Sequence, residues 1–251
     1  MNTTTVYSTK AEKYAKHRWD YALSAVKAIK EITHLSGEST MADIGAGSGI
    51  LTRHFTHLAH RIYALEPNKE LRTLLTDALG ACSNVTVLDG SAENTKLENG
   101  SVDVITAAQA IHWFDPEPAR REMMRILKEK GWLVLVRNYG TNQAQNDAVG
   151  RLMTEEYGAD FSVVNERPKD RPISFYYGND HFRKSTFPFQ FQQNWEGFIG
   201  SLTTASFMPD EDHPLFDKLE MKAREVFSQY SKNGFLTVEG ETELIIGQPS
   251  K

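Results

Sequence analysis

The chain contains 251 residues, carries a formal net charge of -5 and has an isoelectric point near 5.9. Its 40% hydrophobic and 24% charged residues are the balance of a globular protein with a packed core, and its length fits one large domain better than two. The acidic balance argues against a broad basic surface for the phosphates of nucleic acid, so we expect no nucleic-acid partner.

Two further features bear on the compartment. Cys82 is the single cysteine, which excludes an internal disulfide framework and a site built from several thiolates. The first 18 residues are polar and charged where a signal peptide would need an apolar core, and no stretch approaches the ~20 apolar residues of a membrane span. We therefore expect a cytoplasmic protein with no membrane partner.

Between residues 40 and 138, short apolar runs alternate with longer segments of helical spacing. This pattern is typical of a parallel sheet covered by helices on both faces, and it predicts an α/β core. The predicted strands are residues 41–44, 61–65, 85–88, 102–105 and 132–136. The predicted helices are residues 50–58, 68–79 behind Pro67, and 117–128, which begins after Asp115-Pro116 and is closed by Gly131.

The segments on either side of this core have other patterns. Residues 9–32 predict one or two helices on which Tyr14, Arg18 and Tyr21 share a face, and such a segment can cover a ligand. After Asn138 the alternation stops, and a polar stretch as far as Asp180 shows little periodicity. Beyond it we predict strands at residues 187–193 and 235–246 and helices at residues 196–202 and 215–230.

A glycine-rich turn, Asp43-Ile-Gly45-Ala-Gly47-Ser-Gly49, follows the first predicted strand and leads into a helix. Its glycines let the backbone approach a ligand that lies across the strand ends, although phosphate binders and plain tight turns use similar residues. A nicotinamide cofactor favours the spacing G-x-G-x-x-G, whereas the third glycine here comes one residue early and is followed by Ile50. No Walker-type phosphate loop is present, which argues against ATPase chemistry.

Glu66 stands at the end of the second predicted strand, 17 residues after Gly49. A carboxylate at this point can accept hydrogen bonds from both hydroxyls of a ribose and would repel a 2'-phosphate. The alternative is that Glu66 only occupies the solvated end of a strand.

Four motifs now give the chain a family resemblance. They are Asp43-Ile-Gly-Ala-Gly-Ser-Gly49, Ala64-Leu-Glu-Pro67, Gly90-Ser-Ala-Glu93 ahead of Ser101-Val-Asp-Val104, and Ala108-Gln-Ala-Ile-His-Trp-Phe-Asp115. In this order and spacing they resemble class I S-adenosylmethionine-dependent methyltransferases of the methyltransferase type 11 group, close to the trans-aconitate methyltransferase-like enzymes of small molecules. Looser similarity extends over nearly the whole chain, through residues 201–209 and 234–247.

The resemblance implies S-adenosylmethionine as cofactor and a set of residues to hold it. Asp43, Gly45 and Gly47 would line the methionine part, and Glu66 would hold the ribose hydroxyls. Ser91 and Ala92 would meet the adenine, with the Ala92 backbone amide reading most of it because many relatives have an acidic residue where Ser91 stands. The neighbouring residues of the same motifs complete the cofactor set: Ala46, Pro67 and Glu93.

In the family, the segment after the fourth strand runs beneath the sulfonium. This implies that Gln109, Ala110 and His112 lie near the transferable methyl group, with Trp113 and Phe114 alongside. His112 is the candidate general base, since an imidazole titrates near neutral pH; it would equally serve as a hydrogen-bonding group to backbone or cofactor.

The early sequence Tyr14-Ala-Lys-His-Arg18 resembles the family's cover helix, whose tyrosine and arginine close over the carboxylate end of the cofactor. Trp19 replaces the family's proline, and a solvated helix face is the alternative for this segment. The aromatic residues of the C-terminal half are candidates either for an acceptor pocket or for the core: Phe175, Tyr176, Tyr177, Trp195 and Phe207.

The resulting fold prediction is a Rossmann-like, seven-stranded, mostly parallel sheet with helices on both faces and a reversed last strand. Residues 1–35 would form cover helices and residues 36–138 the cofactor-binding core. Residues 139–251 would supply the last strands, the helices on the substrate side, and a cap between Asn138 and Asp180 that selects the acceptor.

The predicted function is in-line transfer of a methyl group to an oxygen, nitrogen or carbon atom of a small-molecule acceptor, with catalysis by positioning and exclusion of water. We expect no metal, because no cluster of His, Cys and carboxylate residues has ligand spacing. The alternatives are a nicotinamide-dependent oxidoreductase and a non-catalytic S-adenosylmethionine-binding protein on the same fold.

Overall fold

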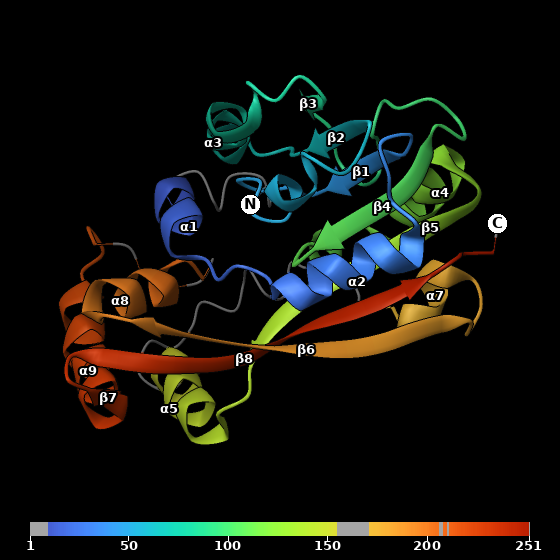
Figure 1. The fold of residues 1–251 in the computed structure, drawn as a ribbon. Coiled ribbons are helices and arrows are strands. Elements are labelled where there is room, and N and C mark those ends of the chain that lie inside the picture. The colour runs from blue at the N-terminus through green and yellow to red at the C-terminus, as the bar shows by residue number, and fades with distance from the viewer. Residues whose placement is uncertain (1–9, 155–170, 206–207, 210, 251) are drawn as a thin grey trace.

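The computed structural model describes residues 10–154, 171–205, 208–209 and 211–250, and these form one twisted sheet with helices on both faces (Figure 1). The strand order is β3-β2-β1-β4-β5-β8-β6, and the two-residue strand β7 pairs with β8. Strands β1 to β5 are parallel, whereas β8 is antiparallel to both β5 and β6. The prediction of a mostly parallel sheet with a reversed last strand is confirmed.

The strands are β1 (Thr40–Ile44), β2 (Arg61–Leu65), β3 (Val85–Leu88), β4 (Val102–Ala108), β5 (Leu127–Gly140), β6 (Phe182–Gln193), β7 (Ser231–Lys232) and β8 (Phe235–Gly247). The helices are α1 (Ala11–His17), α2 (Leu23–Thr33), α3 (Lys69–Leu79), α4 (Pro116–Ile126), α5 (Gln143–Thr154), α7 (Ile173–Tyr177), α8 (Trp195–Thr203) and α9 (Phe216–Tyr230), with the 3-10 turns η2 (Thr52–Phe55) and η3 (Ile111–Trp113). Within these described segments, no helix is long and apolar enough to span a bilayer.

Both faces of the sheet are buried, which explains why its central strands are nearly continuous apolar runs. In β5, Leu133 and Leu135 pack with α4 and α7, whereas Val134 and Val136 pack with α2 and η2 on the opposite face. Figure 1 shows α2 in front of the sheet and α4 behind it. The layers therefore follow directly from the alternation of side chains along a strand.

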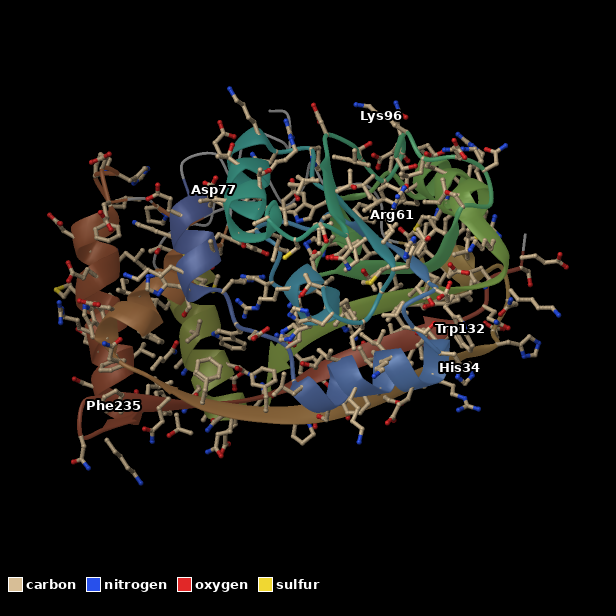
Figure 2. All side chains as sticks on the ribbon, turned by 45° about the horizontal axis from the view of Figure 1, so that its top comes forward. His34, Arg61, Asp77, Lys96, Trp132 and Phe235 are labelled. Atoms are coloured by element: carbon tan, nitrogen blue, oxygen red, sulfur yellow. The ribbon has the colours of Figure 1, made fainter. Side chains whose placement is uncertain are left out.

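The two ends of the sheet carry different elements. In Figure 2, His34 and Trp132 lie together toward one end of the molecule, and Phe235, the first residue of β8, lies at the opposite end. Strands β6 and β8 extend past the core strands toward the Phe235 end, where α5, α8 and α9 gather (Figure 1). This arrangement places the C-terminal helices beside the carboxyl ends of the parallel strands.

The end of α4 corrects one prediction. The helix ends at Ile126, and Gly131 lies inside β5 instead of closing the helix. The pairing of β5 with β4 shifts register between Val102 and Val104, and a Cβ atom at Gly131 would lie 2.7 Å from Leu127 Cδ1 and 3.1 Å from Asp103 O. Gly131 is required by close packing at this irregularity rather than by a helix end.

The N-terminal segment forms two helices separated by residues 18–22. Because α1 ends at His17 and Arg18 has an extended ψ of 137°, Tyr21 does not share a helix face with Tyr14 as predicted. The predicted helix at residues 50–58 is only the 3-10 turn η2. Local spacing located these elements but not their exact type.

The stretch between Asn138 and Asp180 contains helices that its weak periodicity did not predict. Strand β5 continues to Gly140, and α5 and α7 follow. Tyr177 of α7 is fully buried, and its hydroxyl donates to Ile245 O at 2.7 Å and to Leu133 O at 3.1 Å. Residues 155–170 of the predicted cap lie outside the described residues.

Replacing Tyr177 with phenylalanine removes both of these buried hydrogen bonds, so Tyr177→Phe should lower the free energy of unfolding by about 1–3 kcal/mol. Urea denaturation measures this change. Tyr139→Phe is the matched control, since Tyr139 is exposed and its hydroxyl binds Glu241 on the surface. Equal losses for the two variants would show that the Tyr177 hydroxyl does not fasten α7 to the sheet.

Candidate functional site

A cavity of about 310 Å³ opens at the carboxyl ends of β1, β2 and β4, where the strand order reverses between β1 and β4. Ligands of open α/β sheets bind at such a point. Ten of the predicted site residues line this first cavity: Tyr14, Gly45, Gly47, Glu66, Pro67, Ser91, Ala92, Glu93, Gln109 and Ala110. Four others lie elsewhere: Arg18, Asp43, Ala46 and His112.

The glycine turn after β1 is held by the next strand. The amides of Gly45 and Ala46 both donate to Leu65 O at 2.9 Å. Gly45 has a φ of +71°, and a Cβ atom there would lie 2.7 Å from Ala110 Cβ. The turn needs glycine at this position because the backbone is left-handed and because the segment after β4 packs directly against it.

Glu66 is 6% exposed, and both of its carboxylate oxygens face backbone amides. Gly47 N donates to Oε2 and Asn68 N donates to Oε1, each at 2.8 Å. Burial raises the pKa of Glu66, and these two amide hydrogen bonds oppose that rise. Since each oxygen has a second lone pair, Glu66 can still accept hydrogen bonds from a ligand in the cavity.

Asp43 lies behind the cavity and is fully buried. Its Oδ2 accepts from Thr52 Oγ1 at 2.6 Å, and its Oδ1 accepts from Thr106 Oγ1 at 2.7 Å. Burial raises the pKa of Asp43, against the effect of the two hydroxyl groups. The contacts of Asp43 are therefore structural, joining β1 to η2 and β4, and Ala46 likewise packs toward α3 instead of lining the cavity.

The third wall of the cavity comes from the turn after β3. Ser91 and Asn94 form an isolated antiparallel bridge, and Glu93 Oε1 accepts from Asp115 N at 2.9 Å. Ala92 is 2% exposed, and its N–H donates to no group in the described part of the chain. A buried backbone donor without a protein partner is available to a ligand acceptor.

The segment after β4 has unusual backbone geometry. Gln109 has a φ of +53°, its amide donates to Val136 O at 2.9 Å and its side chain donates to Asn138 O at 3.0 Å. Non-glycine residues in this region carry strain that concentrates at functional sites. His112 lies three residues further on, on η3, is half-buried and lines neither the first cavity nor the adjoining second one described below, so its role as a base stays a prediction.

Three lining residues escaped the prediction, namely Asn68, Leu71 and Ala108. Asn68 caps α3 by accepting from Leu71 N at 2.8 Å, and its own amide binds Glu66. The signal that would have identified it is an N-cap residue directly after the Glu66-Pro67 pair. Trp113 and Phe114 line the cavity as expected.

A second cavity, of about 380 Å³, adjoins the first, and Gln109 lines both. Its walls come from residues 17–21, α5, α8, α9 and β8. Its aromatic residues are Trp19, Tyr21, Phe198 and Tyr230. Arg18 lines this cavity, and its guanidinium lies 5.2 Å from the ring centroid of Tyr14 in the first cavity.

The aromatic candidates for an acceptor pocket or for the core line neither cavity where the structure describes them. Phe175, Tyr176 and Tyr177 pack into the core beneath α7, so the core interpretation holds for them. Trp195 packs against Phe227 and beneath Arg224, whose guanidinium carbon is 4.1 Å from its ring centroid. Phe207 lies outside the described residues.

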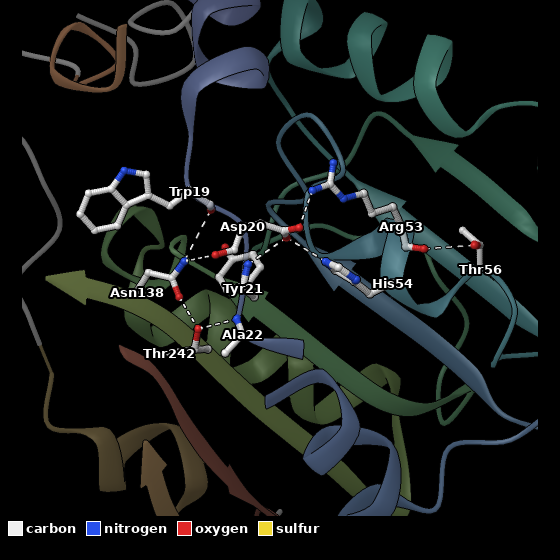
Figure 3. A network of polar contacts seen from close by, with 9 residues as sticks. All are labelled: Trp19, Asp20, Tyr21, Ala22, Arg53, His54, Thr56, Asn138 and Thr242. Atoms are coloured by element: carbon white, nitrogen blue, oxygen red, sulfur yellow. Dashed lines mark hydrogen bonds and ion pairs between the residues drawn. The ribbon is translucent and has the colours of Figure 1, made fainter. Parts of the chain in front are cut away.

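Residues 18–22, the connecting segment, are fixed to the core by Asp20 (Figure 3). Its Oδ2 accepts from Arg53 Nη2 at 2.7 Å, and its Oδ1 lies 2.8 Å from His54 Nε2. Burial raises the pKa of Asp20, but the hydrogen bonds from His54 and Arg53 outweigh it and lower the pKa to about 2.

Asn138 holds the same segment from the opposite side (Figure 3). Its Nδ2 donates to Asp20 O at 2.9 Å, and its Oδ1 accepts from Thr242 Oγ1 at 2.6 Å. Thr242 Oγ1 in turn accepts from Ala22 N at 2.9 Å. The backbone carbonyl of Asn138 also binds Gln109, so one residue joins the connecting segment to the wall shared by the two cavities.

The lowered pKa of Asp20 gives stability a specific pH dependence. Its folded value of about 2 lies below the ordinary 3.8, so the stabilisation is present above about pH 4 and is lost as the pH falls toward 2. We expect wild type to melt at a higher temperature than Asp20→Asn near neutral pH, and this difference to shrink below about pH 4. A difference that stays constant with pH would contradict the assignment.

Gly45→Ala should destabilise the protein by about 1–3 kcal/mol more than Gly100→Ala, as urea unfolding would measure. Both glycines have a positive φ, so the backbone strain is matched, but a Cβ at Gly100 has nothing within 4 Å. The difference isolates the contact with Ala110. Similar losses at the two positions would mean that the turn and the segment after β4 are not tightly packed.

Comparisons with known proteins agree with this geometry. Residues 42–135 match a family model described as a methyltransferase domain. An uncharacterised methyltransferase of Mycobacterium tuberculosis is 35% identical over 127 residues, which cover 50% of this chain and 49% of that protein. An uncharacterised methyltransferase of Schizosaccharomyces pombe is 32% identical over 137 residues, which cover 54% and 53%. The chain thus aligns with about half the length of these curated relatives.

A solved structure shows the same fold. It is a protein of Anaeromyxobacter dehalogenans, provisionally named a type II methyltransferase, with a TM-score of 0.63 and 20% identity over 93% of this chain and 99% of that one. These comparisons show that residues 42–135 are similar to a methyltransferase domain.

Proposed function

We propose that the protein binds S-adenosylmethionine in the first cavity and transfers its methyl group to a small-molecule acceptor in the second. The observation that carries this proposal is that two cavities adjoin at Gln109. The first of them contains the buried carboxylate of Glu66 and the backbone amide of Ala92, unpaired within the described residues. The domain match and the methyltransferase relatives supply independent support.

The polar groups of the first cavity fit the cofactor. Glu66 retains lone pairs for two ribose hydroxyls, and the Ala92 N–H is a donor suited to a ring nitrogen of adenine. The left-handed turn at Gly45 and Gly47 lets backbone approach the amino-acid end. Arg18 lines the second cavity but lies against Tyr14 of the first, and its guanidinium is suited to a carboxylate.

When bound, S-adenosylmethionine supplies a methyl group activated by a positively charged sulfur, and transfer forms the acceptor–methyl bond while the carbon–sulfur bond breaks, leaving S-adenosylhomocysteine. The residues of the chain position the reactants and exclude water. Tyr14 of α1 covers one cavity, and Arg18 and Trp19 border the other. Gln109, fixed by its strained backbone and by Asn138, forms the wall at which the two reactants would meet.

The proposed function assigns a separate role to each part of the chain. Residues 36–138 would hold the cofactor, and residues 139–251 supply α5, α8, α9 and β8 to the wall of the second cavity. The cover role of residues 1–35 rests on Tyr14 and on the contacts of α1 with both α3 and α8. The trans-aconitate methyltransferase-like subgroup stays a prediction, as does cytoplasmic location.

Two alternative functions would give different experimental results. A nicotinamide-dependent oxidoreductase would bind NADH in the first cavity. A non-catalytic protein would bind S-adenosylmethionine but produce no S-adenosylhomocysteine with any acceptor. The second cavity favours catalysis, because it provides room for an acceptor beside the cofactor.

Glu66→Ala should weaken the binding of S-adenosylhomocysteine by about 1–3 kcal/mol, or roughly 5- to 150-fold in Kd, since it removes charged hydrogen bonds to the ribose. Isothermal titration calorimetry measures this directly. Glu98→Ala is the control, because Glu98 is exposed and lies outside the cavity. Unchanged affinity in Glu66→Ala would remove Glu66 from the site.

A further inference from the structure

Gln193, the last residue of β6, presents its side-chain amide to the second cavity. The residue is 9% exposed, and it also borders a hollow lined by Trp19. Its side-chain amide forms no hydrogen bond with any group in the described part of the chain, and its polar atoms are not sealed from the cavity. The amide is therefore available to donate to, and accept from, a molecule bound there.

The other side-chain amides of the second cavity each bind a group of the protein, including Gln109, whose Nε2 donates to Asn138 O at 3.0 Å. Asn138 binds Asp20 O and Thr242, as described above. Asn146 Nδ2 donates to Gly140 O at 2.8 Å, and Gln145 Nε2 donates to Thr237 O at 3.3 Å. Among the described lining residues, Gln193 is therefore the side-chain amide with no protein partner, and it is available to a bound molecule.

Most of the remaining wall is apolar, with Phe198, Leu202, Leu236 and Val238 all buried. Such a surface favours a molecule with an apolar body.

Few charged side chains of the described residues line the second cavity, so it has little to pair with a charged ligand. His17 lies against Gly200, and burial together with nearby Lys16 lowers its pKa, which favours the neutral imidazole at pH 7. Glu239 is exposed at the mouth. Arg18 is the remaining charged side chain among the described lining residues, and the proposed function assigns it to the carboxylate of the cofactor. An anionic acceptor would then be buried without a counter-ion, and a cationic one would have only the exposed Glu239 among the described lining residues.

We propose that the acceptor is an uncharged small molecule with an apolar body and a hydroxyl, carbonyl or amide group that hydrogen-bonds to the side chain of Gln193. This inference rests on the proposed function, because it requires the cofactor to occupy Arg18. It makes Gln193 a specificity-determining residue, since an amide both donates to and accepts from uncharged polar groups.

The test uses two probes with the same apolar body, naphthalene-2-carboxamide and naphthalene-2-carboxylate. Each is titrated calorimetrically into full-length protein saturated with S-adenosylhomocysteine. We expect the carboxamide to bind at least about tenfold more tightly, or 1.4 kcal/mol. Tighter binding of the carboxylate, or no binding of the carboxamide, would overturn the inference while leaving the proposed function intact.

A first titration with S-adenosylhomocysteine alone separates the two proposals. If it does not bind, the proposed function fails, and the inference about the acceptor fails with it because Arg18 loses its partner. If it binds, the two naphthalene probes test the acceptor site independently.

Gln193→Leu should weaken binding of the carboxamide by about tenfold and leave the affinity for S-adenosylhomocysteine unchanged, because Gln193 does not line the first cavity. Gln190→Leu is the matched control: Gln190 lies on the same strand, is exposed and does not line the second cavity. Equal carboxamide affinity in wild type and Gln193→Leu would contradict recognition by this residue, and urea unfolding midpoints verify that both variants are folded.

Discussion

The buried carboxylate of Glu66 holds the candidate cofactor site together. Its two oxygens bind the amides of Gly47 and Asn68, so one side chain joins the glycine turn after β1 to the start of α3. Asp43 supports the same turn from behind by binding Thr52 and Thr106. Two carboxylates whose burial raises their pKa values are thus kept at the strand ends by hydrogen bonds, and Glu66 remains open to a ligand.

A second constraint links the two cavities. Gln109 has a strained backbone and lines both of them, and its side chain binds the carbonyl of Asn138. The side chain of Asn138 holds the connecting segment that carries Arg18 and Trp19 (Figure 3). Through these contacts, the connecting segment that borders the second cavity is positioned by the same strand ends that form the first cavity.

The sequence predicted the parallel core well because its information there is local. The runs that became β1, β2 and β3 are short and mostly apolar, and each is bounded by a turn, which fixes their limits to within a residue. The motifs after these strands placed Glu66 and Ala92 in one cavity because the carboxyl ends of parallel strands share an edge.

Other features depended on contacts that the sequence does not reveal. In the sequence, Gly131 stands where a glycine often ends a helix. In the structure it lies within β5, where Leu127 and Asp103 leave no room for a Cβ atom. The walls of the second cavity come from segments more than 200 residues apart, such as Trp19 and Val238, so no local pattern identifies them. Burial of Tyr177 likewise depends on how α7 meets the sheet.

The most direct test of the account is calorimetric titration of the purified protein with S-adenosylmethionine and S-adenosylhomocysteine, with NADH as the control. The account predicts a single site that binds the first two in the micromolar range, about -8 kcal/mol, and does not bind NADH. Binding of NADH alone, or of none of the three, would contradict it.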